Sequence, residues 1–232
     1  MPPRALEPAG IALVDKPRGP SSFAVVAQIR RATGARTGHA GTLDPFATGL
    51  LLVLSGRATK LAPCLVGLDK RYVTEIDLTS LTTTGDPEGE VEQSHAPPGE
   101  DVLGERLERL RGEVELPIPA ASAVKIGGER AYRLARRGIR VEMPVRRSTV
   151  HALDVISYTG DRVTLDAHVS SGTYIRSLAI ALGGHCATLR RTEVGPFKVT
   201  DAVIPEAFTA ERLLAESDVL SRVEAARPEP GA

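Results

Sequence analysis

The sequence predicts an α+β fold with a largely antiparallel, mixed sheet and flanking helices. Segments of strand and helix pattern follow one another without the regular strand–helix–strand order of a parallel α/β protein. Residues 146–170 read as a strand, a turn at 159–161 and a second strand, which predicts an antiparallel hairpin. The chain has 232 residues, 42% of them hydrophobic, and can therefore bury a substantial core.

The first elements have clear boundaries. Residues 10–17 (GIALVDKP) predict a buried strand that ends at a proline. Apolar residues at helical spacing over 23–34 predict a helix, with Ser21 or Ser22 as its cap and Gly34 as its end. Three segments follow: a Gly- and Thr-rich loop over 38–49, an apolar strand over 50–56, and a helical stretch over 57–67 that breaks near Pro63.

The middle and the end of the chain also consist of predicted strands, helices and loops. Residues 70–78 predict a strand with Tyr72, Thr74 and Ile76 on one face. Residues 82–98 are rich in Gly, Pro and acids, which favours a surface hairpin or loop. The remaining predicted elements are a helix over 102–110 with Leu103, Leu107 and Leu110 on one stripe, a segment over 116–128 too rich in proline for a central strand, a short basic helix over 128–138, a helix over 172–184, a strand over 188–199 and a disordered tail over 224–232.

Charge is distributed unevenly along a chain whose formal net charge is zero. Residues 125–147 hold eight lysines and arginines against two glutamates, whereas residues 86–115 hold ten carboxylates against three arginines. This layout fits either a basic stripe that contacts phosphates or two solvated faces that balance each other.

Several classes of function find no support in the sequence. No stretch has the length of a membrane span or the pattern of a signal peptide, so we expect a soluble cytoplasmic protein. Cys64 and Cys186 lie far apart without a CxxC companion, and the five histidines lack HxH and HExxH spacing. No phosphate-binding glycine loop is present. We therefore expect neither a metal nor a cofactor.

Asp44 is the first candidate for chemistry. It lies in GHAGTLDPFATG (38–49), where three glycines permit unusual backbone conformations and Pro45 biases Asp44 away from helical geometry. An Asp-Pro turn is often only structural. Alternatively, the carboxylate is a nucleophile, which needs no activating base because aspartate ionises near a pKa of about 3.9.

A retaining glycosidase would need a second carboxylate about 5 Å from the first. Asp15, Asp69 and Asp166 are conceivable partners of Asp44, but no local motif joins them to it. Arg176 is the second candidate, because an arginine in the first turn of a helix is electrostatically unfavourable. Either a buried anion holds it there or it is simply exposed.

Six segments in order resemble the TruB family of tRNA pseudouridine synthases. They are LVDKPRGPSS (13–22), GHAGTLDPFATGLLLVLSGRATK (38–60), DKRYVTEIDL (69–78), SAVKIGGERAYRLARRG (122–138), SSGTYIRSLA (170–179) and LRRTEVGPF (189–197). The resemblance implies the pseudouridine synthase fold with a basic thumb-like insertion at about 82–146. It also implies a cofactor- and metal-free isomerisation of uridine 55 in the T-loop of tRNA, with the T-arm as partner, carried out by a monomer. The target base must leave its stack to be reached.

The resemblance also implies roles for single residues. Asp44 corresponds to the nucleophile, which attacks either C1′ of the ribose or C6 of the uracil. Tyr72 corresponds to the tyrosine that packs on the base and relays or accepts the C5 proton, and Arg176 to the arginine that pairs with the aspartate. His39, Tyr174 and Leu189 correspond to residues around the extruded nucleotide. Lys16 belongs to a block that supports the active-site loop, and it is also expected to bind the RNA. Four further cations are expected to contact RNA phosphates: Lys125, Arg133, Arg136 and Arg137.

The sequence departs from the family pattern at several places. TTTGD (82–86) stands where TDTxD is common, Ala121 replaces a usual tyrosine, and the stretch after Arg176 is short. We expect a catalytic domain over 1–210 and a short helix with a disordered tail over 211–232, without a full RNA-binding PUA domain. These departures also fit an alternative, a non-catalytic protein of this fold that binds or folds tRNA.

Overall fold

The computed structural model describes residues 8–122, 124–137, 139 and 141–227. The chain forms two compact units, which we describe separately. Unit 1 comprises Met1–Arg71 and Arg190–Ala232, and unit 2 comprises Tyr72–Leu189. Strands β4 (Lys70–Asp77) and β12 (His185–Val194) each run from one unit into the other. The mixed, mostly antiparallel sheet with helices confirms the predicted fold class.

Unit 1 is built around a fully apolar strand. β3 (Thr48–Ser55) is buried from Gly49 onward, as expected of a strand covered on both faces. β1 (Gly10–Lys16) and β2 (Thr37–Ala40) pair with it antiparallel, and Arg190 and Arg191 of β12 pair with it in parallel. β2 corrects one prediction, because the first part of the expected loop over 38–49 is a strand paired with β3.

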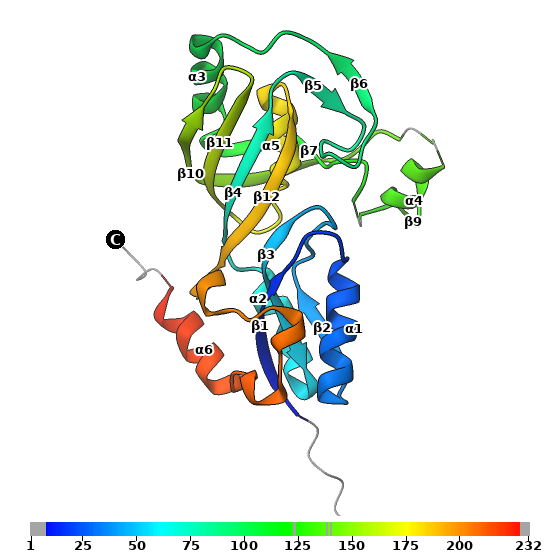
Figure 1. Cartoon of the computed structure of the whole chain (residues 1–232), viewed down its shortest axis with the longest axis vertical. Coiled ribbons are helices and arrows are strands. Elements are labelled where there is room, and N and C mark those ends of the chain that lie inside the picture. Colours follow the sequence, from blue (N-terminus) through cyan, green and yellow to red (C-terminus); the bar gives the residue numbers. More distant parts are fainter. Residues whose placement is uncertain (1–7, 123, 138, 140, 228–232) are drawn as a thin grey trace, which may run out of the picture. The chain divides into compact units, whose positions relative to one another are not determined.

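The helices of unit 1 cover this sheet (Figure 1). α1 (Ser22–Thr33) packs on β2 and β3, and α6 (Glu216–Ala225) packs on β1 and joins the apolar core. α1 begins as predicted, since the Ser21 side chain accepts a hydrogen bond from the Ala24 amide, and it ends at Gly34 in the left-handed conformation. The smaller elements are a 3₁₀ turn (Gly56–Leu61), α2 (Ala62–Val66), β13 (Phe197–Lys198) and three short 3₁₀ turns (Val199–Asp201, Pro205–Ala207 and Ala210–Arg212).

Unit 2 holds the predicted hairpin. β10 (Val145–Tyr158) pairs antiparallel with β11 (Arg162–Val169) and, on its other side, with β7 (Gly112–Pro117). The sheet order here is β12-β4-β11-β10-β7, so the proline-bearing strand lies at the edge, where a missing amide donor costs little. α5 (Ile175–Leu182) packs on β7 and on α3 (Glu100–Arg109). The smaller elements are β5 (Ser80–Thr82), β6 (Val91–Ser94), β8 (Lys125–Ile126), β9 (Glu129–Arg130) and α4 (Ala131–Arg136).

The segment over 82–98 is only partly what its composition predicts. β5 and β6 do form a hairpin, and β6 is exposed. The turn between them, however, buries Thr82 and Asp86, which is 3% exposed. The composition had predicted that the whole segment is exposed to solvent. A buried carboxylate is costly unless another group binds it, so Asp86 needs a partner. Gly138, which was predicted to end the basic helix, and residues 228–232 of the predicted tail lie outside the described residues.

Candidate active-site groups in the two units

Asp44 lies on a short turn between two buried anchors. Leu43 and Phe46 are each 4% exposed, whereas Asp44 is half-buried. The Ala47 amide donates to the Asp44 carbonyl at 3.1 Å and closes the turn. Side chains packed on both sides of a polar residue limit the movement of its backbone, so the Asp44 turn is held in place within unit 1.

Lys16 holds this turn from inside the unit. Its side chain is fully buried, and Nζ donates to the carbonyl oxygens of Pro17 (2.9 Å), Pro45 (3.2 Å) and Ala47 (2.7 Å). An ammonium carries three protons, so its nitrogen can bind several backbone carbonyls at once. These contacts fit a role of Lys16 in supporting the turn.

The start of α1 is bound to the same turn. Ser22 Oγ donates to the Leu43 carbonyl at 2.8 Å and accepts from the Leu43 amide at 2.9 Å. The Gly19 amide donates to the Pro45 carbonyl at 2.8 Å. Two segments well separated in sequence are thus joined by backbone-directed hydrogen bonds, which fix their geometry more tightly than side-chain packing alone.

Arg191 is a supporting residue that the sequence did not reveal. It is 1% exposed, and it donates to the carbonyls of Leu50 (Nε, 2.7 Å) and Gly41 (Nη2, 3.0 Å), which bracket the Asp44 turn. Its backbone also packs so closely on Gly49 that a Cβ there would lie 2.2 Å from the Arg191 carbonyl oxygen. The only signal in the sequence was its place in LRRTEVGPF, because nothing local marks an arginine as buried.

The buried charge of Arg191 affects two neighbouring groups. Burial, and then the positive charge of Arg191, lower the pKa of His39 below its ordinary value. The same two causes lower the pKa of Lys70 to about 8, although Asp69 acts in the opposite direction. His39 therefore favours the neutral form near pH 7. Its Nδ1 is buried and finds no hydrogen-bond partner among the residues that the structure describes.

Arg176 is the central polar residue of unit 2. It lies in the first turn of α5 and is 3% exposed. Its guanidinium donates to the carbonyls of Thr84 (Nη1, 2.8 Å) and Ala121 (Nη2, 2.9 Å), and Nη1 lies 3.3 Å from Oδ2 of Asp86. The sequence raised the possibility of a buried anion at this position, and within unit 2 Asp86 is such an anion. Asp86 is the one acidic residue of TTTGD (82–86), the segment where the family pattern TDTxD has two.

The other predicted groups of unit 2 differ in burial. Tyr72 in β4 is 8% exposed and Leu189 in β12 is 7% exposed, while Tyr174 is half-buried at the residue before α5. Thr74 Oγ1 donates to the Thr188 carbonyl at 2.7 Å and ties the two strands together. Tyr72, Tyr174, Arg176 and Leu189 thus belong to unit 2, whereas Lys16, His39 and Asp44 belong to unit 1.

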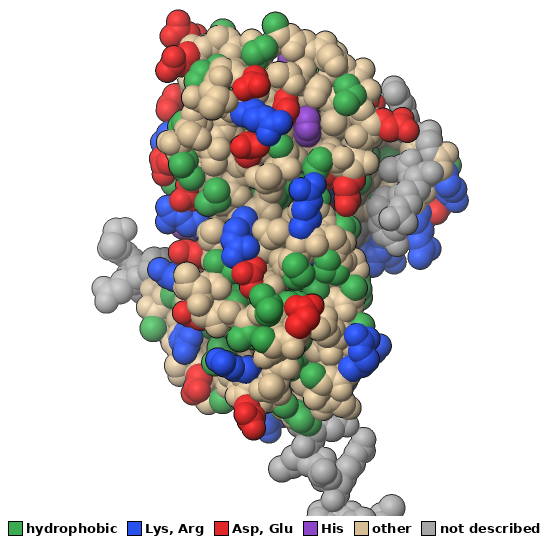
Figure 2. Space-filling view, in the orientation of Figure 1, with side chains coloured by type: hydrophobic (Ala, Val, Ile, Leu, Met, Phe, Trp, Pro, Cys, Tyr) green, Lys and Arg blue, Asp and Glu red, His purple; other side chains and the backbone are tan. Residues whose placement is uncertain are grey.

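The predicted RNA-binding lysine and arginines lie at the β8–β9 hairpin and α4, where Lys and Arg side chains gather in Figure 2. Lys125 and Arg133 are exposed. Arg137 is exposed and contacts Glu129 at 2.9 Å, a surface ion pair of the kind that contributes little to stability. The side chain of Arg136 lies outside the described residues.

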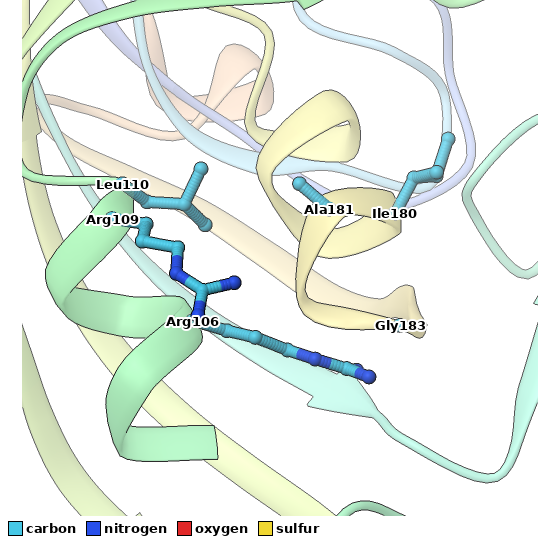
Figure 3. A pocket seen from close by; sticks show the side chains of 6 residues that line it. All are labelled: Arg106, Arg109, Leu110, Ile180, Ala181 and Gly183. Carbon is cyan, nitrogen blue, oxygen red and sulfur yellow. The ribbon is translucent and has the colours of Figure 1, made fainter. Parts of the chain in front are cut away.

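An open hollow of about 420 Å³ lies between α3 and α5 (Figure 3). Arg106 lines it and donates from Nη1 to the Leu182 carbonyl at 2.6 Å, which caps the last turn of α5. None of the predicted site residues lines this hollow. Across the described part of the chain, no three His, Cys, Asp or Glu side chains are placed to hold a metal ion. No described helix has the length and apolar character needed to span a membrane.

Known proteins share this sequence and fold. The model of the "TruB family pseudouridylate synthase (N terminal domain)" matches residues 29–175. A protein of Mycobacterium sp. (strain KMS) named tRNA pseudouridine synthase B is 43% identical over 221 residues, covering 90% of this chain and 74% of that protein. The protein of the same name from Arthrobacter sp. (strain FB24) is 41% identical over 234 residues, covering 94% and 75%.

Among solved structures, a chain in the crystal structure of a Cbf5-Nop10-Gar1 complex matches with a TM-score of 0.64 and 31% identity. The match covers 84% of this chain and 51% of that one, so this chain spans about half of its length. Family model, sequence relatives and fold agree with the resemblance noted from the six segments. The chain belongs to the TruB family of pseudouridylate synthases.

Proposed function

We propose that this chain isomerises uridine 55 in the T-loop of tRNA to pseudouridine, with Asp44 as the nucleophile. The observation that carries the proposal is the construction of the Asp44 turn. Lys16, Ser22 and Arg191 all bind its backbone, and each of the three is buried. A turn that served only to reverse the chain would not require two buried cations to hold its carbonyls, since burying a charge is costly.

The carboxylate can begin the reaction without a base. A reference aspartate is ionised at neutral pH, so its oxygen is already nucleophilic. It forms a bond to C1′ of the ribose or to C6 of the uracil, and the bond between C1′ and N1 of the base breaks. The base turns, C5 bonds to C1′, the proton leaves C5, and the carboxylate is released. The product is an isomer of the substrate, so the proposed route needs no cofactor or metal.

The groups of unit 2 supply the remaining roles in this proposal. The resemblance to the family assigns Arg176 the part of the arginine that orients the nucleophile and favours its ionised form. The position of Arg176 is set by Asp86 and by two carbonyls, which leaves the guanidinium little freedom. Tyr72 provides the aromatic face for the extruded base and accepts or relays the C5 proton. Tyr174, Leu189 and, from unit 1, His39 line the nucleotide.

Exposed cations extend the contact to the T-arm. Lys125, Arg133, Arg136 and Arg137 bind phosphates, and the weak surface pair of Arg137 with Glu129 can be exchanged for a phosphate oxygen. Binding should therefore weaken as salt concentration rises. We propose that the chain acts as a monomer in the cytoplasm, where a tRNA substrate would be found.

The test replaces Asp44 with Asn and measures tritium release from C5-labelled uridine in tRNA. Asn has a similar shape but no nucleophilic carboxylate, so turnover should fall below detection. Asp218→Asn, an exposed position in α6, is the matched control and should keep full activity. Substantial turnover by Asp44→Asn would refute the role of Asp44. An unmutated chain that binds tRNA and yields no pseudouridine would instead support the non-catalytic alternative.

A further inference from the structure

Phe23 differs from the other phenylalanines of the chain. The sequence has four, and Phe46, Phe197 and Phe208 are 4%, 0% and 7% exposed. Phe23 is 72% exposed, although it lies in the first turn of α1 beside buried Ser22. A single exposed apolar residue is common in proteins and needs no function. The residues around Phe23, however, suggest a function for it.

The Phe23 ring packs against one other aromatic ring. The ring centroids of Phe23 and His39 are 5.3 Å apart with planes at 80°, an edge-to-face arrangement. The lowered pKa of His39 means that this partner is a neutral aromatic ring near pH 7. The contact holds the Phe23 ring in one orientation, and most of its surface stays open to solvent. A held, exposed aromatic ring is the form that stacking platforms for nucleic-acid bases take.

Phe23 is also fixed relative to the proposed nucleophile within unit 1. The adjacent residue Ser22 exchanges two hydrogen bonds with Leu43, which directly precedes Asp44. The Gly19 amide bonds the Pro45 carbonyl on the other side of Asp44. Arg18, next to Gly19, is exposed and adds a positive charge to this segment. RNA bound at Asp44 would thus meet a cation and an aromatic ring on the same support.

We propose that Phe23 stacks on a base of the substrate RNA next to the uridine that is isomerised. This inference rests on the proposed function and adds a contact that positions the RNA outside the reacting nucleotide. RNA is commonly recognised through unstacked loop bases that rest on aromatic side chains. Phe23 is a positioning residue in this proposal, because it contacts the substrate away from the reacting atoms.

The chain has no tryptophan, which gives a direct spectroscopic test. Phe23→Trp introduces a single fluorophore at the proposed contact, and Leu220→Trp introduces one at an exposed apolar position of α6 that is 44% exposed. Each is made together with Asp44→Asn and titrated with a T-arm stem-loop RNA. We expect RNA to quench the tryptophan emission of the Phe23→Trp protein and to leave that of the Leu220→Trp protein unchanged. Unchanged emission of the Phe23→Trp protein, at RNA concentrations that saturate binding in a gel-shift assay, would overturn the proposal.

Steady-state kinetics with Asp44 intact separates stacking from simple apolar cover. Phe23→Ala and Phe23→Leu should each raise KM about 5- to 150-fold, which corresponds to the roughly 1–3 kcal/mol of one stacked base, while kcat changes less than about twofold. Phe23→Tyr should keep the original KM. If Phe23→Leu also keeps it, or if kcat falls while KM does not change, Phe23 only covers His39 and the proposal is wrong.

These outcomes also separate the inference from the proposed function. An unmutated chain that makes no pseudouridine would refute the proposed function, and the fluorescence titration would still report whether Phe23 meets a base. An active chain whose Phe23 variants keep the original KM would refute this inference alone. Thermal denaturation of Phe23→Ala checks that the variant is folded, and we expect its Tm to stay close to that of the unmutated chain.

Discussion

The buried pair of Asp86 and Arg176 allows a quantitative prediction for unit 2. Asp86 Oδ2 lies 3.3 Å from Arg176 Nη1, and the two side chains are 4% and 3% exposed. The other carboxylate oxygen, Oδ1, accepts from Thr84 Oγ1 at 2.6 Å and from the Glu88 amide at 3.0 Å. Asp86→Ala removes all three interactions, including this carboxylate partner of the buried Arg176 guanidinium.

Removing one partner of a buried ion pair costs about 3–5 kcal/mol. We therefore expect Asp86→Ala to lower the free energy of unfolding by that amount, and the Tm by roughly 6–20 °C for a chain of this size. Urea titrations followed by circular dichroism measure the change. Asp154→Asn is the matched control in the same unit, because its carboxylate is 59% exposed and 4.0 Å from Arg111. Its effect should stay within about 0.5 kcal/mol.

A double variant identifies the cause of the loss. Asp86→Leu with Arg176→Met removes both charges of this buried pair, so it should unfold at a higher urea concentration than Asp86→Leu alone. A loss of less than about 1 kcal/mol in Asp86→Ala would refute the reasoning, because the Arg176 charge would then be satisfied without Asp86. A double variant no more stable than the single one would show that packing, rather than charge, sets the cost.

Two further predictions concern unit 1. Gly49 has φ +102° and no room for a Cβ, so Gly49→Ala should destabilise the chain by about 3 kcal/mol or more in urea titration. The control is Gly104→Ala at an exposed position of α3 in unit 2, which should stabilise the chain by about 0.5–1 kcal/mol. Equal effects would contradict the close approach of Arg191 to Gly49. Burial, and then the charge of Arg191, lower the pKa of Lys70 to about 8, below its ordinary 10.5. Between pH 8 and pH 10.5, Lys70 is therefore protonated in the unfolded chain but not in the folded one. Because the unfolded state binds more protons in this range, the free energy of unfolding should rise with pH. In Lys70→Met the free energy of unfolding should rise less steeply with pH over this range. The same rise in the variant and in the unmutated chain would contradict the lowered pKa of Lys70.

The sequence was most informative where local patterns decide structure. The cap at Ser21, the left-handed Gly34 and the alternation around Tyr72 each depend on a few neighbouring residues, and the structure confirms all three. Periodic apolar spacing likewise predicted the leucine stripe of α3, which is buried. Such features follow from backbone geometry and from the separation of apolar and polar side chains, so they can be read without knowing the fold.

The candidate site could be predicted only in part. The segment around Asp44 marked the carboxylate as unusual, and the position of Arg176 raised the possibility of a buried anion. The identity of that anion could not be read, because Asp86 lies far away in sequence, in a segment whose Gly, Pro and acid content favours the surface. Which acid of a polar loop turns inward depends on the element packed over it, and that is information held by the tertiary structure.

The sequence by itself determined the fold class, the approximate positions of the main helices and of the long hairpin, and the residues that resemble a uridine-isomerising site. Only the tertiary structure revealed that Lys16 and Arg191 are buried supports of the Asp44 turn, and that Phe23 is exposed against His39. Lysine, arginine and phenylalanine all occur both inside and outside proteins. Their burial depends on hydrogen-bond acceptors and rings brought from distant segments, so it is decided when the chain folds.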